Sequence, residues 1–340
     1  MNILLTSVGR RNYLVDYFKE AVKPHGGKIY AINSSEDSIG LVAADESQVS
    51  PLIHDSSYND FLIQYCLKHE INCIIPLFDI DLPILSKLKK KLNEIDVTTI
   101  VADYWMIEIA NDKWKTQKFL RENNFNTVPS FLSPKEFLKA NAFEESTFPV
   151  FVKPRWGMGS ISVFKAETKE ELHFFFKQVK KEIKKSYLKY ESAVDIENAV
   201  IIQEKLPGLE YGLDIINDLN GTYQTTIVKN KIAMRSGETD SAVIVNDPIL
   251  KRLGERIGRI SKHPGNMDVD VFFDGKMSYI LEMNPRFGGG YPFSHSAGVN
   301  LPAAIVNWQL GKKVDIKKLL SARIGTKSIK GIQMINMIGP

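Results

Sequence analysis

The sequence predicts a mixed fold, in which an α/β part with a parallel, doubly wound sheet is followed by an α+β part rich in antiparallel strands. In the first part, short apolar runs alternate with helical patterns, which is typical of a parallel sheet. The apolar runs lie at 2–6, 28–32 and 73–77, and the helical patterns at 58–69 and 82–92. In the second part, short turns such as Asn220-Gly221 separate strand-like runs. These runs lie at 148–153, 161–164, 200–204, 211–216 and 222–232.

The composition excludes several classes of protein. With 340 residues, 44% of them apolar, the chain can bury at least one core, and we expect about two or three domains. Lys and Arg number 44 against 40 Asp and Glu, and this net charge of +4 is too near balance to indicate a nucleic-acid or membrane partner, so we expect neither. Two cysteines, Cys66 and Cys73, exclude a disulfide scaffold. Because no targeting segment or long apolar run occurs, we expect a soluble, cytoplasmic protein.

The first domain, 1–110, opens on a buried strand at Asn2–Thr6, a turn at 7–11 and a helical pattern from Tyr13 to Val22. No Gly-x-Gly-x-x-Gly occurs at this turn, which argues against a dinucleotide-dependent oxidoreductase. Asn111-Asp112 then reads as the N-cap of a helix from Lys113 to about Asn123.

Two later segments have a plain interpretation. Residues 170–189 carry many lysines with apolar residues at helical spacing, which favours an amphipathic helix with a solvated basic face over a nucleic-acid patch. Residues 327–340 read as a terminal strand or a loose tail.

A glycine turn follows directly on an expected strand at residues 151–160. Lys153 ends the strand, and Gly157 and Gly159 with Ser160 expose backbone N–H groups that can approach an anion closely. The lysine adds a positive charge that stabilises phosphoryl oxygens. This pattern indicates a phosphate site, although a glycine turn by itself is more often only a turn.

A hairpin at residues 268–286 carries oxygen ligands. Its turn contains Asp274-Gly275, a strong hairpin signal. A three-residue loop would place Asp270 and Glu282 on one face, whereas a two-residue loop would place them on opposite faces. A metal site therefore requires the longer turn or a bulge, and Asn284 then completes a ligand set that suits Mg²⁺. An exposed hairpin face with ordinary acidic residues is the alternative.

The segments that flank this hairpin suggest further contacts. Residues 201–211 form a strand, a Pro-Gly turn and a second strand, which can offer backbone groups to an adenine and a carboxylate to a ribose. Arg286 follows the hairpin and can bind anionic oxygens in a fork. The glycine run 288–290 indicates a close backbone approach. We expect an acceptor pocket lined by Arg286, Gly289, Tyr291, Ser294 and His295, with Ser7, Arg10 and Arg11 from the first domain.

In this order, the motifs at Lys113, Lys153, Gln203-Glu204, Glu210 and Glu282-x-Asn284-x-Arg286 resemble the ATP-grasp superfamily. The segments Thr6–Arg11 and Arg235–Glu238 look closer to short, stand-alone relatives of the carbamoyl phosphate synthase large subunit. The resemblance covers roughly residues 1–310. It implies a Rossmann-like pre-ATP-grasp domain followed by a two-lobed ATP-grasp fold. The small lobe with its linking helix would span 111–198, the large lobe 199–312 and a tail or terminal strand 313–340.

The resemblance also implies roles for single residues. Lys113 and Lys153 would bind the ATP phosphates beneath a lid formed by Gly157, Gly159 and Ser160. Backbone around Gln203, Glu204 and Leu206 would hold adenine, and Glu210 the ribose. Arg235 and Arg286 would stabilise the transferred phosphoryl group. The expected ligands of Mg²⁺, or of Mn²⁺ in its place, are Asp270, Glu282 and Asn284.

The chemistry implied is phosphorylation of a small carboxylate to an acyl phosphate and its conversion by an amine to an amide, with release of ADP and phosphate. Phosphoryl transfer needs positioning and charge neutralisation more than a nucleophile, and no Gly-x-Ser-x-Gly occurs. A phosphotransferase of the carbamate-kinase half-reaction type and a non-catalytic nucleotide-binding protein are the alternatives. The large synthase carries two such units, so we do not expect carbamoyl phosphate synthesis by this chain alone. A homodimer is the assembly that the resemblance implies.

Overall fold

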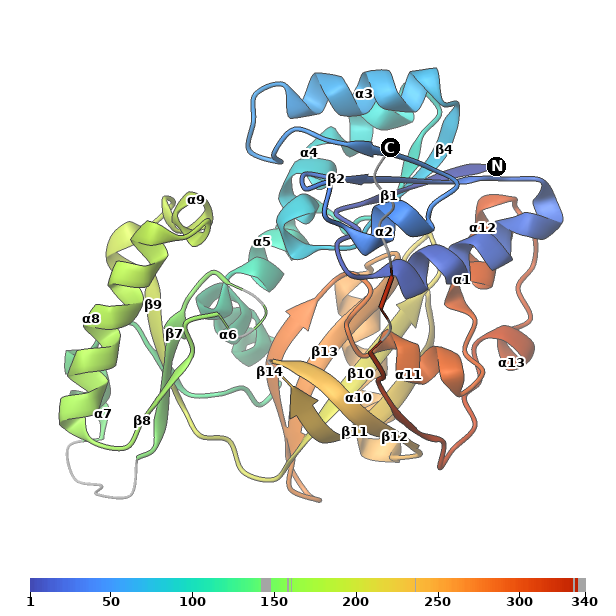
Figure 1. Cartoon of the computed structure of the whole chain (residues 1–340). Helices are drawn as coiled ribbons and strands as arrows, with labels where there is room; N and C mark the ends of the chain where they lie inside the picture. Colours follow the sequence, from blue (N-terminus) through green and yellow to red (C-terminus); the bar gives the residue numbers. More distant parts are fainter. Residues whose placement is uncertain (142–147, 158, 160, 236, 333, 336–340) are drawn as a thin grey trace.

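A computed structural model describes residues 1–141, 148–157, 159, 161–235, 237–332 and 334–335. Its strands form three sheets that follow one another along the chain, as Figure 1 shows. The sequence-based prediction of an α/β part followed by an α+β part is confirmed.

The first sheet is parallel and has the order β3-β2-β1-β4-β5. The hydrophobic runs of its inner strands are buried on both faces, because helices cover both. Its strands are β1 (Asn2–Thr6), β2 (Ile29–Asn33), β3 (Glu46–Val49), β4 (Ile71–Pro76) and β5 (Thr98–Thr99). The helices are α1 (Asn12–Val22), α2 (Ile39–Ala43), α3 (Tyr58–Lys68), α4 (Leu82–Asn93) and α5 (Tyr104–Asn111).

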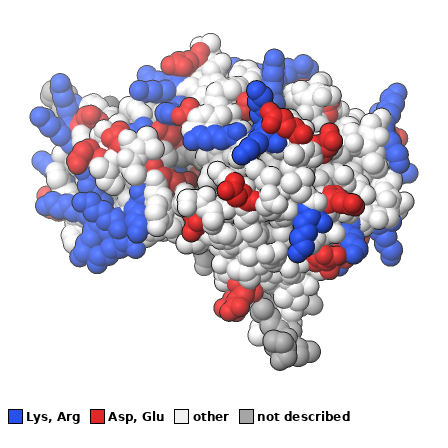
Figure 2. All heavy atoms as spheres, turned by 90° about the horizontal axis from the view of Figure 1, so that it is seen from above, with Lys and Arg blue, Asp and Glu red and all other residues white. Residues whose placement is uncertain are grey.

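The second sheet is small and antiparallel, with the order β6-β9-β7-β8. Its strands are β6 (Ser130–Phe131), β7 (Val150–Pro154), β8 (Phe164–Ala166) and β9 (Val200–Glu204). Around them lie α7 (Pro134–Ala140), α8 (Lys169–Lys185) and α9 (Leu188–Ser192), whereas α6 (Lys113–Glu122) packs on α5 and β14. Helix α8 buries Leu172, Val179 and Ile183, and Lys and Arg side chains gather on the surface over this lobe (Figure 2). The predicted amphipathic helix is thus confirmed, although it ends at Lys185.

The third sheet is antiparallel, with the order β14-β13-β10-β11-β12-β15. Its strands are β10 (Leu209–Asn217), β11 (Tyr223–Arg235), β12 (Glu238–Val245), β13 (Gly265–Phe273), β14 (Ser278–Asn284) and β15 (Lys327–Ile329). The remaining helices are α10 (Pro248–Ser261), α11 (Tyr291–Ser296), α12 (Leu301–Gln309) and α13 (Ile316–Leu319).

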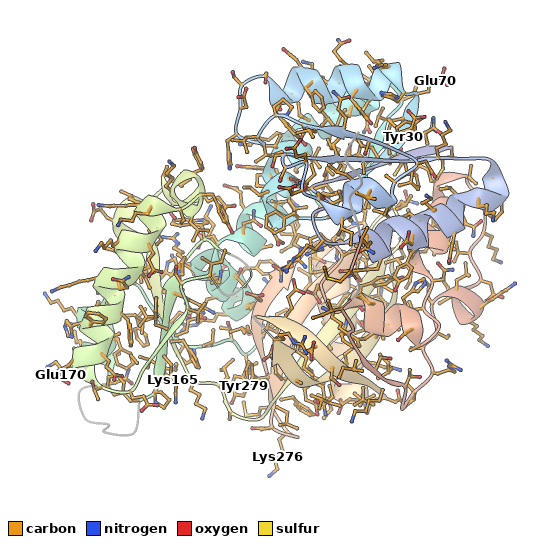
Figure 3. The ribbon with its side chains drawn as sticks, in the orientation of Figure 1. Tyr30, Glu70, Lys165, Glu170, Lys276 and Tyr279 are labelled. Carbon is orange, nitrogen blue, oxygen red and sulfur yellow. The ribbon has the colours of Figure 1, made fainter. Side chains whose placement is uncertain are left out.

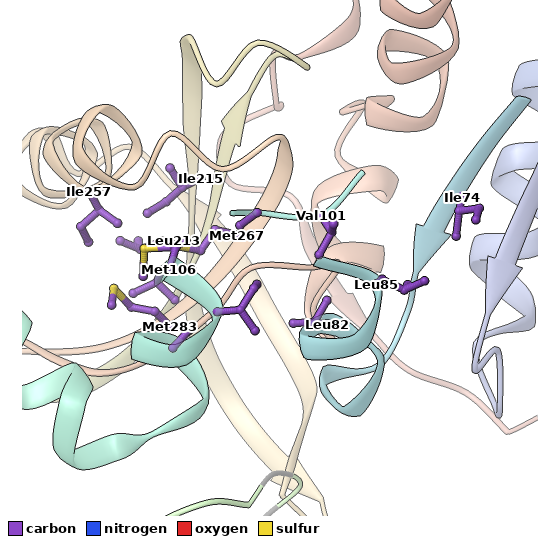
Figure 4. Packing of buried hydrophobic residues seen from close by; sticks show 14 of the residues in the cluster. Ile74, Leu82, Leu85, Val101, Met106, Leu213, Ile215, Ile257, Met267 and Met283 are labelled. Atoms are coloured by element: carbon purple, nitrogen blue, oxygen red, sulfur yellow. The ribbon is translucent and has the colours of Figure 1, made fainter. Parts of the chain in front are cut away.

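The first and third sheets share cores, whereas the small sheet has its own. Leu82 and Leu85 of α4 belong to the same buried cluster as Leu213 of β10 and Met267 of β13 (Figure 4). A second cluster joins α1 to α12, which lie side by side in Figure 1. Each such buried aliphatic side chain contributes about 1.5–3 kcal/mol. These clusters join the third sheet to the parallel sheet and its helices.

Several details differ from the sequence-based expectations. The strand expected at 161–164 is wrong, because residues 161–163 form a turn and β8 begins at Phe164. At the C-terminus the strand interpretation holds for Lys327–Ile329, which pair with β12, while residues 336–340 lie outside the described part of the chain. The domain limits at 110, 198 and 312 stay a prediction. No helix in the described ranges is both long and apolar enough to cross a membrane.

Candidate active site

The β13–β14 hairpin brings its acidic residues to one face by means of a bulge. Residues 274–277 connect the strands, and Asp274 accepts hydrogen bonds from the backbone N–H groups of Lys276 and Met277. Val271 pairs with Ile280, but Asp270 pairs with Glu282, so Leu281 is an extra residue in β14. Without this bulge the two carboxylates would point to opposite faces. The sequence required a longer turn or a bulge for a metal site here, and the bulge is present.

Lys231 of β11 lies within this acidic face. Its Nζ is 2.6 Å from Asp270 Oδ1 and 2.6 Å from Glu210 Oε1. Burial alone would lower the pKa of Lys231, but the two carboxylates outweigh it and hold this pKa above its ordinary value. Burial raises the pKa of Asp270 to about 7, and Asp268 and Glu282 add to this rise while Lys231 opposes it. Around Lys231, the carboxylates of Glu210, Asp268 and Asp270 outnumber its single ammonium group. This arrangement is suited to a further cation.

Lys153 lies at the end of β7 and is only 8% exposed. Burial and the neighbouring Lys113 lower the pKa of Lys153 to about 8. It forms no ion pair with any side chain in the described ranges. A buried ammonium group without a carboxylate partner is favourable only where an anion approaches it. Such a group suits the binding of phosphate.

A buried ion pair fixes the start of α6 against the end of β7. Arg155 Nε and Nη2 donate to the two carboxylate oxygens of Asp112, each at 2.7 Å. Asp112 also caps α6, as predicted, by accepting from the backbone N–H groups of Trp114 and Lys115. Lys113, the first residue of α6, donates to the carbonyl oxygen of Gly157 at 2.5 Å. The glycine turn, Lys113 and Lys153 are therefore held together.

Most of the predicted nucleotide-site residues line one cavity of about 310 Å³. Its apolar walls include Phe151, Ile161, Val163 and Leu281, which suits a flat aromatic ring. Gly159 adopts a φ of 63°, a conformation that favours glycine, so the turn can follow this path. The predicted residues in this lining are Lys113, Lys153, Gly157, Gly159, Gln203, Glu204, Leu206, Glu210, Asp270 and Glu282. Ser160 lies outside the described residues.

A smaller cavity of about 130 Å³ continues from the acidic face toward the parallel sheet. Asp270 and Glu282 line both cavities, and Asn284, Arg286 and Gly289 line the smaller one. We refer to this smaller space as the reaction cavity.

Arg286 in the reaction cavity is doubly paired, with Asp79 at 2.8 Å and Asp268 at 3.3 Å. These carboxylates raise the pKa of Arg286 although burial opposes them. The neighbouring Gly288 is required by packing, because a Cβ there would lie 2.1 Å from the carboxyl carbon of Asp268. The close backbone approach predicted for the glycine run is therefore made at least partly to Asp268, a residue of the chain itself.

Three predicted site residues lie elsewhere. Arg235 is 59% exposed at its side chain, pairs with Asp240 and is not part of either lining. Ser294 is fully buried, and its hydroxyl donates to Asp214 inside the protein, so it does not reach the reaction cavity. Arg10 lies at the turn after β1 and lines a third cavity. The arrangement thus gives no support to the roles predicted for Arg235 and Ser294.

Several residues of the site were not predicted from the sequence. Lys231 and Lys229 are two positions apart in β11, and Lys229 pairs with the buried Asp214. Their spacing could have predicted this, because two lysines two positions apart in an apolar strand lie on one face of the sheet. Asp79, which pairs with Arg286, comes from the loop after β4 and carries no local signal. His295, expected near the acceptor, stacks on Tyr17 with ring centroids 3.6 Å apart.

The donor set fits Mg²⁺. Within the described residues no three Asp, Glu, His or Cys side chains converge as a complete protein cage. Asp270 and Glu282 face each other in the ladder, and the amide of Asn284 lies next to Glu282 at 3.4 Å. Mg²⁺ in phosphoryl-transfer sites is usually held by one or two carboxylates and by substrate phosphates. These three side chains would hold it here.

Comparisons with known proteins agree with this geometry. Residues 110–290, more than half of the chain, match the ATP-grasp domain family, and residues 3–100 match the PylC-like N-terminal domain family. A carbamoyl-phosphate synthase of Methanobrevibacter smithii is 24% identical over 312 residues, covering 90% of this chain and 80% of that protein. The carbamoyl phosphate synthase large chain of Clostridium acetobutylicum is 22% identical, and the match spans 28% of its length and 88% of this chain.

Two solved structures share the fold. The biotin carboxylase domain dimer of Hydrogenobacter thermophilus 2-oxoglutarate carboxylase, in complex with MgADP, ADP and bicarbonate, superposes with a TM-score of 0.72 at 17% identity. The match covers 96% of this chain and 73% of that one. An L-amino acid ligase from Bacillus licheniformis gives a TM-score of 0.68 at 18% identity, covering 91% and 75%. From the family match over residues 110–290 and the arrangement of the lobes around the cavity, the chain belongs to the ATP-grasp family of ligases.

Proposed function

We propose that this protein joins a carboxylate to an amine at the expense of ATP, through an acyl phosphate. The observation that supports this most directly is the meeting of Asp270 and Glu282 with Lys113 and Lys153 in one cavity, beside the glycine turn. The buried Lys153, the partly exposed Lys113 and a pair of opposed carboxylates supply charge neutralisation, which phosphoryl transfer requires. ATP is therefore the expected co-substrate.

In the first step, a carboxylate oxygen of the acid bonds to the γ-phosphorus while the bond to the β–γ bridging oxygen breaks, and ADP leaves. In the second step, the amine nitrogen bonds to the acyl carbon, the bond to the phosphate oxygen breaks, and the nitrogen loses a proton to solvent. Lys113 and Lys153 bind the phosphates in the first step, and Arg286 borders the acid. Mg²⁺, when bound, supplies positive charge to the phosphoryl oxygens.

Backbone and apolar groups hold the nucleotide base in this proposal. The connection at Gln203–Leu206 lines the cavity opposite Leu281 of the bulge. Glu210 lines it as well, and its carboxylate is shared with Lys231. Glu210 therefore has a structural partner in addition to the ribose contact expected for it.

The test is a coupled assay of ADP release with pooled acids and pooled amines, run on the wild type and on two variants. Lys153→Ala and Glu282→Ala should each lower turnover by on the order of 10²-fold or more, because each removes a charge-stabilising group. Lys276→Ala is the matched control. Lys276 lies at the tip of the β13–β14 hairpin, at the opposite end of the molecule from Tyr30 of the parallel sheet (Figure 3). Unchanged rates for both site variants would defeat the proposal.

The dependence on the amine separates this reaction from a simple phosphotransferase. An amide-forming ligase should release ADP at an appreciable rate only when acid and amine are both present. ADP release with the acid alone, together with a phosphorylated product in the mass spectrum, would favour the phosphotransferase. Mn²⁺ is expected to replace Mg²⁺ in the assay, since both take carboxylate and amide oxygens.

Assembly and location remain predictions. The expected homodimer can be checked by light scattering on the purified chain, and the cytoplasmic location by fractionation of cells that express it.

A further inference from the structure

The third cavity, of about 670 Å³, lies at the carboxyl ends of the parallel strands. Its floor comes from the loops after β1, β2, β3 and β4, at residues 7–11, 33–34, 50–55 and 78–80. In open α/β sheets, ligands bind in the crevice outside these strand ends. We call this space the outer cavity.

The outer cavity continues into the reaction cavity. Arg11, Phe78 and Glu238 line both of them. A single molecule can therefore lie in the outer cavity and place one end beside Asp270, Glu282 and Arg286.

Arg11, at the junction, is a partly buried cation, and Asp79 and Glu238 compensate its charge only from a distance. Its Nη1 donates to the carbonyl oxygen of Phe287 at 2.6 Å, and it pairs with no carboxylate in the described ranges. Arg286, by contrast, is already paired with two carboxylates. Burial, and then the charge of Arg286, lower the pKa of Arg11 although Tyr13 opposes them. A guanidinium has five N–H donors, so the remaining donors of Arg11 can bind a carboxylate in a fork.

Apolar and aromatic side chains make up about half of the outer-cavity lining, beside polar and charged residues that include Arg10 and Asp55. Leu52 is 64% exposed and Tyr190 is 50% exposed, yet both line this concavity. His54 stacks on Tyr190 with ring centroids 4.7 Å apart, so the loop after β3 and α9 meet in the wall of the cavity. Large apolar side chains that remain exposed inside a concavity mark a site for an apolar ligand.

Glu238 limits the negative charge that a ligand can carry where the outer cavity meets the reaction cavity. It lines both cavities and is paired only at the surface, with Lys330 at 3.3 Å. A second carboxylate at the junction would therefore face a negative side chain, which is unfavourable.

We infer that the acid substrate is a monocarboxylate with a bulky apolar or aromatic body, which occupies the outer cavity and whose carboxylate is bound by Arg11. This inference rests on the proposed function and names the class of acid that it uses. Arg11 is a substrate-binding residue in this account, while Leu52 and the His54–Tyr190 pair shape the wall for the body.

The test compares acids of different size and charge with one nucleophile. Hydroxylamine traps an activated acid as a hydroxamate, so the natural amine need not be known. With the full chain, ATP and Mg²⁺, 3-phenylpropionate should give a kcat/KM about tenfold or more above that of acetate, succinate or bicarbonate, since burial of a phenyl group contributes more than the 1.4 kcal/mol that this ratio requires.

Two variants locate the contacts. Arg11→Gln should raise the KM for 3-phenylpropionate by about tenfold or more while the KM for ATP stays unchanged, because a charge-assisted contact with the acid is lost. Leu52→Ala should lower the kcat/KM for 3-phenylpropionate more than that for acetate, because only the larger acid reaches this wall, and it keeps the test valid if Arg11→Gln does not fold. Arg259→Gln is the matched control, because Arg259 is 66% exposed on α10 and pairs with Glu255.

Calorimetric titration with 3-phenylpropionate separates the two claims. If no acid supports ADP release but 3-phenylpropionate binds and Arg11→Gln abolishes this binding, the proposed function fails and the pocket assignment holds. If acetate or bicarbonate reacts as well as 3-phenylpropionate and Arg11→Gln changes neither KM nor binding, the pocket assignment fails and the proposed function holds. Absence of both reaction and binding overturns both claims.

Discussion

Lys231 and Asp270 form an ion pair, 2.6 Å long, inside the acidic face of the large sheet. The same ammonium group contacts Glu210, so one lysine joins a predicted ribose-binding carboxylate to a predicted metal ligand. The two carboxylates outweigh burial and keep the pKa of Lys231 above its ordinary value, so it remains charged. This lysine therefore stabilises the acidic face before any nucleotide or metal arrives.

Removal of this lysine should destabilise the protein strongly. Lys231→Met leaves the partly buried carboxylates of Asp270 and Glu210, which are 16% and 26% exposed, without their shared cation. Since the loss of one partner of a fully buried pair costs about 3–5 kcal/mol, we expect a loss of about 2–3 kcal/mol here. Chemical denaturation of wild type and variant measures this difference. Lys276→Met, at the exposed hairpin tip, should change the free energy of unfolding by less than about 0.5 kcal/mol. Equal stabilities of the wild type and Lys231→Met would contradict the role assigned to Lys231.

The pH dependence of ATP use should report Lys153. Burial and Lys113 lower the pKa of Lys153 to about 8, so the free enzyme loses this positive charge as the pH rises through that value. The kcat/KM for ATP should therefore fall above about pH 8, since binding of the phosphates requires the protonated form. In Lys153→Arg, the decrease of kcat/KM at alkaline pH (the alkaline limb) should shift to higher pH, because a guanidinium stays charged. An identical alkaline limb in the variant would show that another group controls it.

Asp112 should contribute more to stability than an ordinary helix cap. It caps α6 and also pairs with the buried Arg155 through two contacts of 2.7 Å. Asp112→Ala should cost about 3 kcal/mol, since it removes the buried partner of that guanidinium and leaves only the partly exposed Asp195, 3.0 Å away. Asp247 caps α10 by accepting from Ile249 and Leu250, so Asp247→Ala should cost only about 1 kcal/mol. Equal losses in denaturant titrations would mean that the ion pair adds nothing to the cap.

His263 should make the protein less stable in acid. It is fully buried, contacts Ser261 Oγ and the carbonyl oxygen of Ile215, and burial lowers its pKa from 6.5 to about 4. Between these two pH values the unfolded chain binds more protons than the folded chain, so stability is present above pH 6.5 and is lost as the pH falls toward 4. The loss is on the order of 3 kcal/mol. In His263→Gln, the free energy of unfolding should differ less between pH 7 and pH 4.5 than it does in the wild type. An unchanged difference would exclude a contribution from His263.

Local patterns predicted much of the fold and of the nucleotide cavity. The strand at Asn2–Thr6 and the cap at Asp112 follow from short-range rules, and both are observed. The facing of Asp270 and Glu282 depends on a bulge, which alternation along a strand cannot reveal. From the sequence alone, it therefore stayed open whether these two carboxylates lie on one face of the hairpin.

Long-range contacts account for what was missed. Arg286 was expected to bind phosphate, and its pairing with Asp79, from the loop after β4, is a long-range contact that the sequence did not predict. The packing of α12 on α1 joins segments that are far apart in the chain, and no local pattern encodes it. Arg235 carried a motif-based expectation, yet the course of β11 leaves it exposed beside Asp240.

The central claim is that the acid becomes an acyl phosphate, and transfer of oxygen from acid to phosphate tests it most directly. The acid that gives the highest rate is labelled with ¹⁸O in its carboxylate and incubated with the protein, ATP, Mg²⁺ and an amine. Since the attacking oxygen leaves with the phosphoryl group, the account predicts about one ¹⁸O atom per phosphate released. Phosphate that contains no ¹⁸O after amide formation would contradict it.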